Sequence, residues 1–246
     1  MTLLSSLPPE LASGSTLRLV ALGDSLVYGY GDREGGGWVE RLRRQWMAAD
    51  SHVLYNLGVR GDRVARVLQR LEGEFRRRGE LRDRQPDGLI LSVGGNDSAR
   101  LGHWRGRNFT EFGRFESQLA ELLDLAKQLG PVWFVGMTPA DETRMPFADC
   151  LYYTHSDRER YNQATAAACQ ERGIPFLNVA ALWEGRGELW WQSRLCADGL
   201  HPNAAGYRAL LQEVVAWDAF APLMQATLPL QPLQSQQQSE GHLTAV

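Results

Sequence analysis

The chain has 246 residues, of which 43% are hydrophobic, and a formal net charge of -3 at pH 7. This length and composition fit one large globular domain or two small ones, and the charge does not indicate a general affinity for nucleic acid. The N-terminus has no signal-peptide pattern and no run of eighteen apolar residues occurs, so we expect a cytoplasmic protein without a membrane span. The three cysteines (Cys150, Cys169 and Cys196) are far apart and predict neither a disulfide framework nor a metal site.

Five short apolar runs, bounded by Gly, Pro, Asn or Asp, predict strands that are buried on both faces. They are Leu17–Leu22, Val53–Asn56, Gly88–Val93, Val132–Met137 and Pro175–Val179. Segments with helical spacing of apolar residues alternate with them: 37–50, 63–78, 115–130, 157–173 and 202–220. This alternation predicts one parallel five-stranded sheet with helices on both faces, in the α/β class.

The two ends of the chain differ from this pattern. Residues 1–14 predict a flexible arm, and residues 222–246 form a Gln-rich, Pro-punctuated stretch that predicts a flexible tail. The predicted domain therefore covers residues 15–221.

Polar and glycine-rich motifs follow the predicted strands, at the sheet edge where parallel α/β proteins bind their ligands. The first strand leads into Gly-Asp-Ser with Ser25, the second into "NLGVRGD" with Gly58 and Gly61, and the third into "GGND" with Asn96. The fifth is followed, across a loop, by "DGLHP", which contains Asp198 and His201. These residues are therefore expected to lie close together.

Acyl transfer requires this set of groups. A serine hydroxyl needs an imidazole to accept its proton, and a carboxylate commonly holds that imidazole in the right tautomer. We therefore predict Ser25 as the nucleophile, His201 as the general base and acid, and Asp198 as its partner. The backbone amides of Ser25 and Gly61 and the side-chain amide of Asn96 are the predicted oxyanion hole.

Each motif also has a structural interpretation. Gly-Asp-Ser is a common turn sequence, His201 could cap the final helix, and Gly58 competes with Gly61 for the oxyanion role. The glycine-rich loop 29–37 and the long segment 138–153 are candidate walls of a substrate pocket. Three aromatic residues of that segment could face substrate or pack the loop: Phe147, Tyr152 and Tyr153.

Together, "GDSL" at 23–26, "NLGVRGD" with Gly61, "GGND" at 94–97 and "DGLHP" at 198–202 resemble the motifs of the GDSL, or SGNH, hydrolase family. The resemblance spans residues 17–220. It implies a flavodoxin-like three-layer α/β/α fold, a triad of Ser25, Asp198 and His201, an oxyanion hole of Ser25, Gly61 and Asn96, and no cofactor or metal. We expect the substrate to be a small-molecule ester with a small or medium acyl group, such as a short-chain ester, a lysophospholipid or an acyl thioester, or, alternatively, an O-acetylated carbohydrate.

Three further hypotheses remain open. The glycine-rich loop after the first strand suggests a flavodoxin-like domain that binds phosphate or a nucleotide, although no P-loop or Gly-x-Gly-x-x-Gly motif is present. A carboxylate-rich edge with Asp24, Asp97, Asp198 and His201 suggests a metal-dependent phosphatase. Residues 60–84 contain nine arginines and five acidic residues, which predict a solvated helix face or, alternatively, a surface for an anionic partner or membrane.

Overall fold

The computed structural model describes residues 16–48, 52–79 and 84–225. At its centre is a parallel sheet of five strands in the order β2-β1-β3-β5-β7, as predicted. The strands are β1 (Arg18–Gly23), β2 (Val53–Gly58), β3 (Gly88–Ser92), β5 (Val132–Val135) and β7 (Phe176–Leu177). β7 is shorter than the predicted strand because Asn178 caps a helix that begins at Val179.

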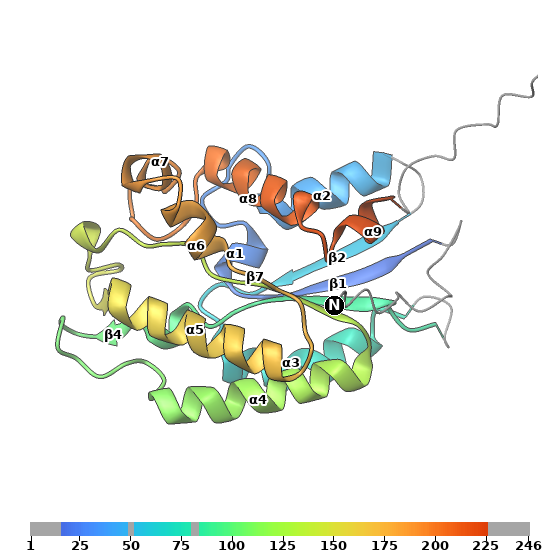
Figure 1. The fold of residues 1–246 in the computed structure, drawn as a ribbon, viewed down its shortest axis with the longest axis horizontal. Helices are drawn as coiled ribbons and strands as arrows, with labels where there is room; N and C mark the ends of the chain where they lie inside the picture. The colour runs from blue at the N-terminus through green and yellow to red at the C-terminus, as the bar shows by residue number, and fades with distance from the viewer. Residues whose placement is uncertain (1–15, 49–51, 80–83, 226–246) are drawn as a thin grey trace, which may run out of the picture.

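Helices cover both faces of the sheet and give three layers (Figure 1). One face carries α2 (Gly37–Ala48), α8 (Ala204–Ala216) and α9 (Ala221–Gln225). The other carries α3 (Val64–Arg76), α4 (Phe112–Leu129) and α5 (His155–Glu171). The predicted flavodoxin-like α/β/α architecture is thereby confirmed.

The central strand β1 places apolar side chains on both faces of the sheet. Leu19 and Ala21 belong to the core beneath α2 and α8, whereas Val20 and Leu22 belong to the core beneath α3 and α4. Side chains of a strand alternate between the two faces of a sheet, so an uninterrupted apolar run fills both cores. All six residues of β1 are buried, which places this strand in the middle of the domain.

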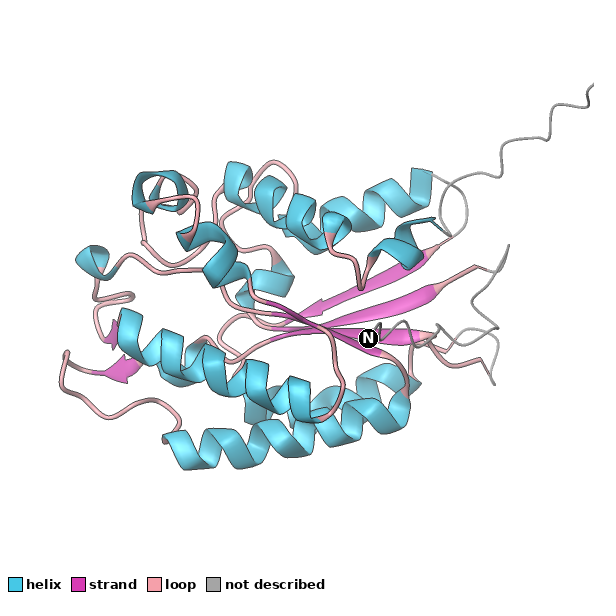
Figure 2. Cartoon of the chain, in the orientation of Figure 1, coloured by secondary structure: helices cyan, strands magenta, loops and turns pink. Residues whose placement is uncertain are grey.

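Short elements gather beyond the carboxyl ends of the strands (Figure 2). They are α1 (Ser25–Tyr28), the 3₁₀ helices η2 (Asn96–Ser98) and η3 (Glu142–Arg144), the antiparallel pair β4 (Arg100–Leu101) and β6 (Leu151–Tyr152), α6 (Val179–Glu184) and α7 (Glu188–Gln192). The hydrophobic periodicity predicted none of them, because segments of two to six residues are too short to establish a period.

The C-terminal boundary of the domain differs from the predicted one at residue 221. α9 starts at Ala221, and Leu223 is 1% exposed within the core that includes Trp46 and Phe220. Burial of this leucine extends the packed domain beyond residue 221 and corrects the expected start of the tail. Residues 1–14 and 226–246, predicted to be flexible, lie outside the described residues.

Within the described part of the chain, no helix is both long and apolar enough to cross a membrane.

Candidate active site

Ser25 lies at the start of α1, directly after β1. The Oδ1 atom of Asp24 accepts a hydrogen bond of 2.9 Å from the backbone N–H of Leu26 and so caps this single turn. The turn lies close against β3, where a Cβ atom on Gly23 would be 2.0 Å from the carbonyl oxygen of Ser92. Gly-Asp-Ser is therefore a tight connection that only glycine permits, and it presents Ser25, which is 7% exposed, at the sheet edge.

The loop before α8 brings His201 to Ser25. Nε2 of His201 lies 2.9 Å from Oγ of Ser25, and Nδ1 lies 2.7 Å from Oδ2 of Asp198. Oδ1 of Asp198 accepts the backbone N–H groups of Leu200 and His201 at 2.9 and 3.0 Å. Burial opposes ionisation of Asp198, but these hydrogen bonds hold its pKa below the usual range. The three predicted triad residues are thus brought together, with an ionised carboxylate behind the imidazole.

Two aromatic rings hold the imidazole of His201. The ring centroid of Tyr30 is 4.5 Å away and that of Phe147 is 5.5 Å away, both in edge-on arrangements. Tyr30 belongs to the loop 29–37 and Phe147 to the segment 138–153, the two segments predicted as pocket walls. Both therefore reach the site, where they restrict the orientation of His201.

Asn96, at the start of η2, faces the same edge. Its Nδ2 atom donates to the carbonyl oxygen of Asp62 at 2.9 Å and to Oδ2 of Asp24 at 3.3 Å. The hydroxyl of Tyr153 donates to Oδ1 of Asn96 at 3.1 Å. The amide is thereby oriented, with its nitrogen towards the loop that contains Gly61 and towards the residue before Ser25.

The structure separates the roles of Gly58 and Gly61. A Cβ atom on Gly58 would lie 2.1 Å from the backbone nitrogen of Tyr28, so this glycine allows β2 to pack against α1. Gly61 has φ of +80°, and a Cβ atom there would meet no other atom within 4 Å. The neighbouring Asp62 accepts a hydrogen bond from Asn96 through its backbone carbonyl oxygen. Gly61 is thus the glycine of the motif with an open side, and its part in an oxyanion hole stays a prediction.

Arg158 of α5 is a site residue that the sequence did not indicate. It is 6% exposed, its Nη2 atom donates to the carbonyl oxygen of Thr138, and its Nε atom has no hydrogen-bond partner among the described residues. Burial raises the pKa of Asp24 to about 7, against the opposing effects of the Leu26 N–H group and of Arg158. In the sequence, Arg158 is one of several charged residues in a helical segment, and only the docking of α5 places it here.

The cavity beside Ser25 is small, with a volume of about 20 Å³. Leu26, Leu200, Tyr153 and Thr138 form its walls together with the catalytic candidates and Arg158. Of the three aromatic residues in the segment 138–153, Tyr152 alone turns elsewhere, and it packs against Trp104. This space shares Thr138 and Arg158 with a neighbouring cavity of about 230 Å³.

The carboxylates considered for a metal site have different partners. Asp97 accepts hydrogen bonds from the backbone of Val64 and from Oγ1 of Thr110, and burial raises its pKa to about 6. Asp24 accepts hydrogen bonds from the backbone of Leu26 and the side chain of Asn96, whereas Asp198 is hydrogen-bonded to His201. Residues 16–48, 52–79 and 84–225 contain no group of three or more His, Cys, Asp or Glu side chains placed to hold a metal ion.

Comparison with known proteins adds a family and a set of structural neighbours. A profile of the GDSL-like lipase/acylhydrolase family matches residues 21–209. A lipase/acylhydrolase from Enterococcus faecalis superposes with a TM-score of 0.64 at 21% identity, over 81% of this chain and 94% of that one. A catalytic mutant of an acetylxylan esterase from Geobacillus stearothermophilus gives 0.62 at 17% identity, over 82% and 94%.

A third neighbour, a member of the lipolytic G-D-S-L family from Veillonella parvula, superposes with a TM-score of 0.60 at 21% identity, over 83% of this chain and 99% of that one. At such identities the likeness to these three structures concerns the fold. No curated protein sequence matches the chain.

Proposed function

The chain belongs to the GDSL-like lipase/acylhydrolase family, and from this premise we propose that it is a serine hydrolase that cleaves carboxylic ester bonds. One observation carries the proposal: a continuous path of hydrogen-bonding distances, 2.9 Å and 2.7 Å, from Ser25 Oγ through His201 to Asp198. Nucleophile, base and orienting acid stand in the order that acyl transfer needs.

In the first half of the reaction, Nε2 of His201 takes the proton of Ser25 as Oγ attacks the ester carbonyl carbon. Asp198 remains ionised, accepts a hydrogen bond from the Nδ1–H group of the resulting imidazolium and stabilises its charge. When the tetrahedral intermediate collapses, the bond to the leaving oxygen breaks, and His201 protonates the departing alcohol. An acyl group remains on Ser25.

In the second half, His201 takes a proton from a water molecule, which attacks the acyl carbon. The proton then returns to Oγ of Ser25 as the acid leaves. Water is the only co-reactant, and the serine and the histidine end the cycle in their starting states.

The negative charge of the two tetrahedral intermediates needs fixed donors. We assign this role to the backbone N–H groups of Ser25 and Gly61 and to Nδ2 of Asn96. A preorganised donor of this kind is worth roughly 3 kcal/mol of transition-state stabilisation in other serine hydrolases. The hydrogen bond from Tyr153 supports the assignment, because it orients the Asn96 amide with its NH₂ group on the side of Asp24.

The acyl group that we propose is short. A cavity of about 20 Å³ beside Ser25, walled by Leu26 and Leu200, suits an acetyl group better than a fatty acyl chain. The same observation favours the second candidate, deacetylation of an O-acetylated carbohydrate, and one of the structural neighbours is itself named an acetylxylan esterase. The two candidates share every catalytic step and differ in the alcohol.

Hydrolysis of p-nitrophenyl acetate by wild type and Ser25→Ala tests the proposed function. We expect the variant to lose activity by about four orders of magnitude or more, because the acyl-enzyme cannot form. Ser117→Ala, at an exposed position of α4, is the matched control and should keep full activity. Full activity of a folded Ser25→Ala protein would refute the serine mechanism, and loss of wild-type activity in EDTA would favour the metal-dependent alternative.

Parallel assays distinguish the two alcohols. p-Nitrophenyl esters of two to twelve carbons and acetylated xylo-oligosaccharides would be compared by kcat/KM. Activity that declines steeply beyond four carbons supports the short acyl pocket, and higher kcat/KM on the acetylated sugars selects the carbohydrate esterase.

A further inference from the structure

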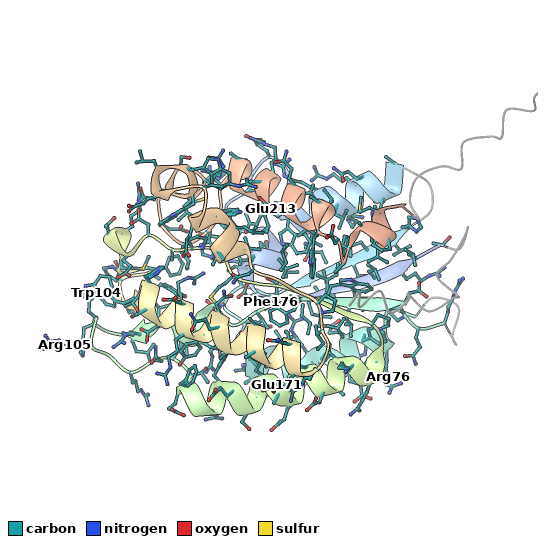
Figure 3. All side chains as sticks on the ribbon, viewed as in Figure 1. Arg76, Trp104, Arg105, Glu171, Phe176 and Glu213 are labelled. Carbon is teal, nitrogen blue, oxygen red and sulfur yellow. The ribbon has the colours of Figure 1, made fainter. Side chains whose placement is uncertain are left out.

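A wide groove lies on the face formed by α3, α4 and α5. Its volume is about 720 Å³, and it shares no lining residue with the cavity beside Ser25. α4 lies beside both α3 and α5 on this face of the sheet (Figure 1). The groove is bordered on one side by the loop 102–111, whose tip carries Trp104 and Arg105 (Figure 3).

Five arginines from four separate segments of the chain line this groove. One precedes α3, one is in the first turn of α3, one is in the loop before α4, one is in the first turn of α4, and one is on α5. They are Arg63, Arg66, Arg107, Arg114 and Arg160. Among the described lining residues, Glu111 is the only acidic one, and its two carboxylate oxygens accept hydrogen bonds from the N–H groups of Gly113 and Arg114 at the start of α4.

These five arginines differ from many others on the surface in having no ion pair. Several arginines elsewhere have carboxylate partners, among them Arg76 with Glu72 at 2.9 Å, Arg172 with Asp124 at 2.7 Å and Arg208 with Glu34 at 2.7 Å. Isolated exposed arginines such as Arg33 and Arg105 also have no ion pair among the described residues, but only the groove brings five of them to one cavity. In the groove, no guanidinium lies within 4.0 Å of a carboxylate of the described residues. The described lining residues therefore carry five positive charges and one negative charge, in a chain whose net charge is -3.

Two phenylalanines hold part of this charge in place. The guanidinium of Arg63 lies 4.3 Å from the ring centroid of Phe109, and that of Arg160 lies 3.6 Å from that of Phe112. A guanidinium stacked on a ring keeps its N–H groups at the edge, where they can donate in pairs to phosphate or carboxylate oxygens. The groove thus offers oriented donors as well as charge.

We propose that this groove binds a soluble small molecule that carries several phosphate or carboxylate groups. Its volume falls within the range of pockets for small ligands. It is concave, whereas a bilayer presents a broad surface that would touch only the rim. Five guanidinium groups around one cavity can neutralise several anionic groups at once, and bidentate pairing favours oxoanions.

Of the described arginines in the basic run at residues 60–84, Arg63 and Arg66 line this groove. Three of its other arginines have partners, Arg70 with Asp62, Arg76 with Glu72 and Arg78 with Glu74, as expected of a solvated helix face. The paired arginines of the run thus fit a solvated helix face, whereas Arg63 and Arg66 fit a surface for an anionic partner. Arg107, Arg114 and Arg160 come from outside the run, so no local charge pattern indicates the site.

Isothermal titration calorimetry with tripolyphosphate at 50 mM salt tests the proposal without relying on any enzymatic activity. The test protein is the double variant Arg66→Gln/Arg114→Gln, and the control is Arg76→Gln/Arg172→Gln, which removes the same charge from paired surface positions. We expect affinity to fall at least tenfold in the groove variant and less than twofold in the control. Absence of binding by wild type, or equal weakening in both variants, would overturn the proposal.

Two further arms address other anionic partners. Binding of the wild type to phosphatidylserine vesicles or to a single-stranded DNA oligonucleotide, with no binding of tripolyphosphate, would overturn the small-molecule proposal in favour of that macromolecule. Thermal melting checks that each variant is folded. If Arg66→Gln/Arg114→Gln does not fold, the single variant Arg160→Gln takes its place. A tenfold loss in Arg160→Gln would carry the same conclusion, because Arg160 is exposed and its ring contact is with Phe112.

Discussion

The hydroxyl of Tyr153 donates a hydrogen bond of 3.1 Å to Oδ1 of Asn96. Tyr153 is 1% exposed, and burial raises the pKa of its hydroxyl above the usual range, so the group remains a donor at every accessible pH. A donor at Oδ1 distinguishes the two ends of the Asn96 amide and leaves Nδ2 on the side of Asp24 and Asp62. Tyr153 is in this sense a positioning residue for the proposed oxyanion hole.

Tyr153→Phe should therefore lower kcat for p-nitrophenyl acetate roughly tenfold with little change in KM. A hydrogen bond of this kind contributes about 1 kcal/mol, and the loss should fall mainly on the transition state, where Asn96 is proposed to donate. Tyr152→Phe is the control, because that ring packs against Trp104 away from the cavity. Equal effects of the two substitutions, or a change confined to KM, would contradict the positioning role.

Alanine at Gly58 and alanine at Gly61 should affect different properties, the first mainly stability and the second mainly kcat. Gly58→Ala brings Cβ within 2.1 Å of the Tyr28 backbone, so we expect a loss of about 3 kcal/mol in the free energy of unfolding. In Gly61→Ala the new Cβ atom contacts no neighbour, and the strain of φ at +80° lowers the free energy of unfolding by about 1 kcal/mol. We expect kcat to fall because the backbone N–H group shifts. Urea unfolding and steady-state kinetics measure both. Unchanged kcat in Gly61→Ala would remove Gly61 from the oxyanion hole.

The sequence predicts the sheet, and it predicts that the candidate triad residues lie close together, because both expectations depend on local patterns. Each strand is a short apolar run, and each triad or oxyanion candidate follows a strand within a motif of a few residues. Although 176 positions separate Ser25 from His201, the rule that parallel strands end at one edge is enough to bring them together.

Residues whose roles depend on helix docking could not be predicted in the same way. Arg158 lies on α5, where Glu159, Arg160 and Glu171 are exposed but Asp157 and Arg158 are buried. The spacing of charged residues in the sequence does not separate these two groups. The arginines of the groove likewise come from four separate segments that meet only after folding. The helix α9 has only five residues, and the sequence around its buried Leu223 has the composition of the tail that follows.

Asp198→Asn should reduce kcat by a factor of about 10³–10⁴ while the protein stays folded. The Oδ1 atom of the asparagine can still accept the N–H groups of Leu200 and His201, but its NH₂ group would face Nδ1 of His201. The imidazole would then carry its proton on Nε2 and could not accept the proton of Ser25. Asp218→Asn, at an exposed position, is the matched control. A less than tenfold effect of Asp198→Asn would show that His201 does not need this carboxylate.

Asp24 should make the stability of the protein depend on pH between about 4 and 7. Burial raises the pKa of Asp24 from 3.8 to about 7, so between these values the folded state holds a proton that the unfolded state has released. Stability contributed by this group is therefore lost as pH rises, by up to about 4 kcal/mol at pH 7. In Asp24→Asn this dependence disappears.

Chemical unfolding of wild type and Asp24→Asn at pH 4, 5, 6 and 7 measures the effect. The free energy of unfolding of Asp24→Asn, minus that of the wild type, should increase steadily from pH 4 to 7 and then level off above pH 7. Asp97, whose pKa is also raised by burial, is present in both proteins, and its charge is one of the smaller causes of the raised pKa of Asp24. Asp149→Asn, at an exposed position, should show no such trend. A difference between Asp24→Asn and wild type that stays constant from pH 4 to 7 would mean that Asp24 is ionised throughout, with Arg158 and the Leu26 N–H group outweighing its burial.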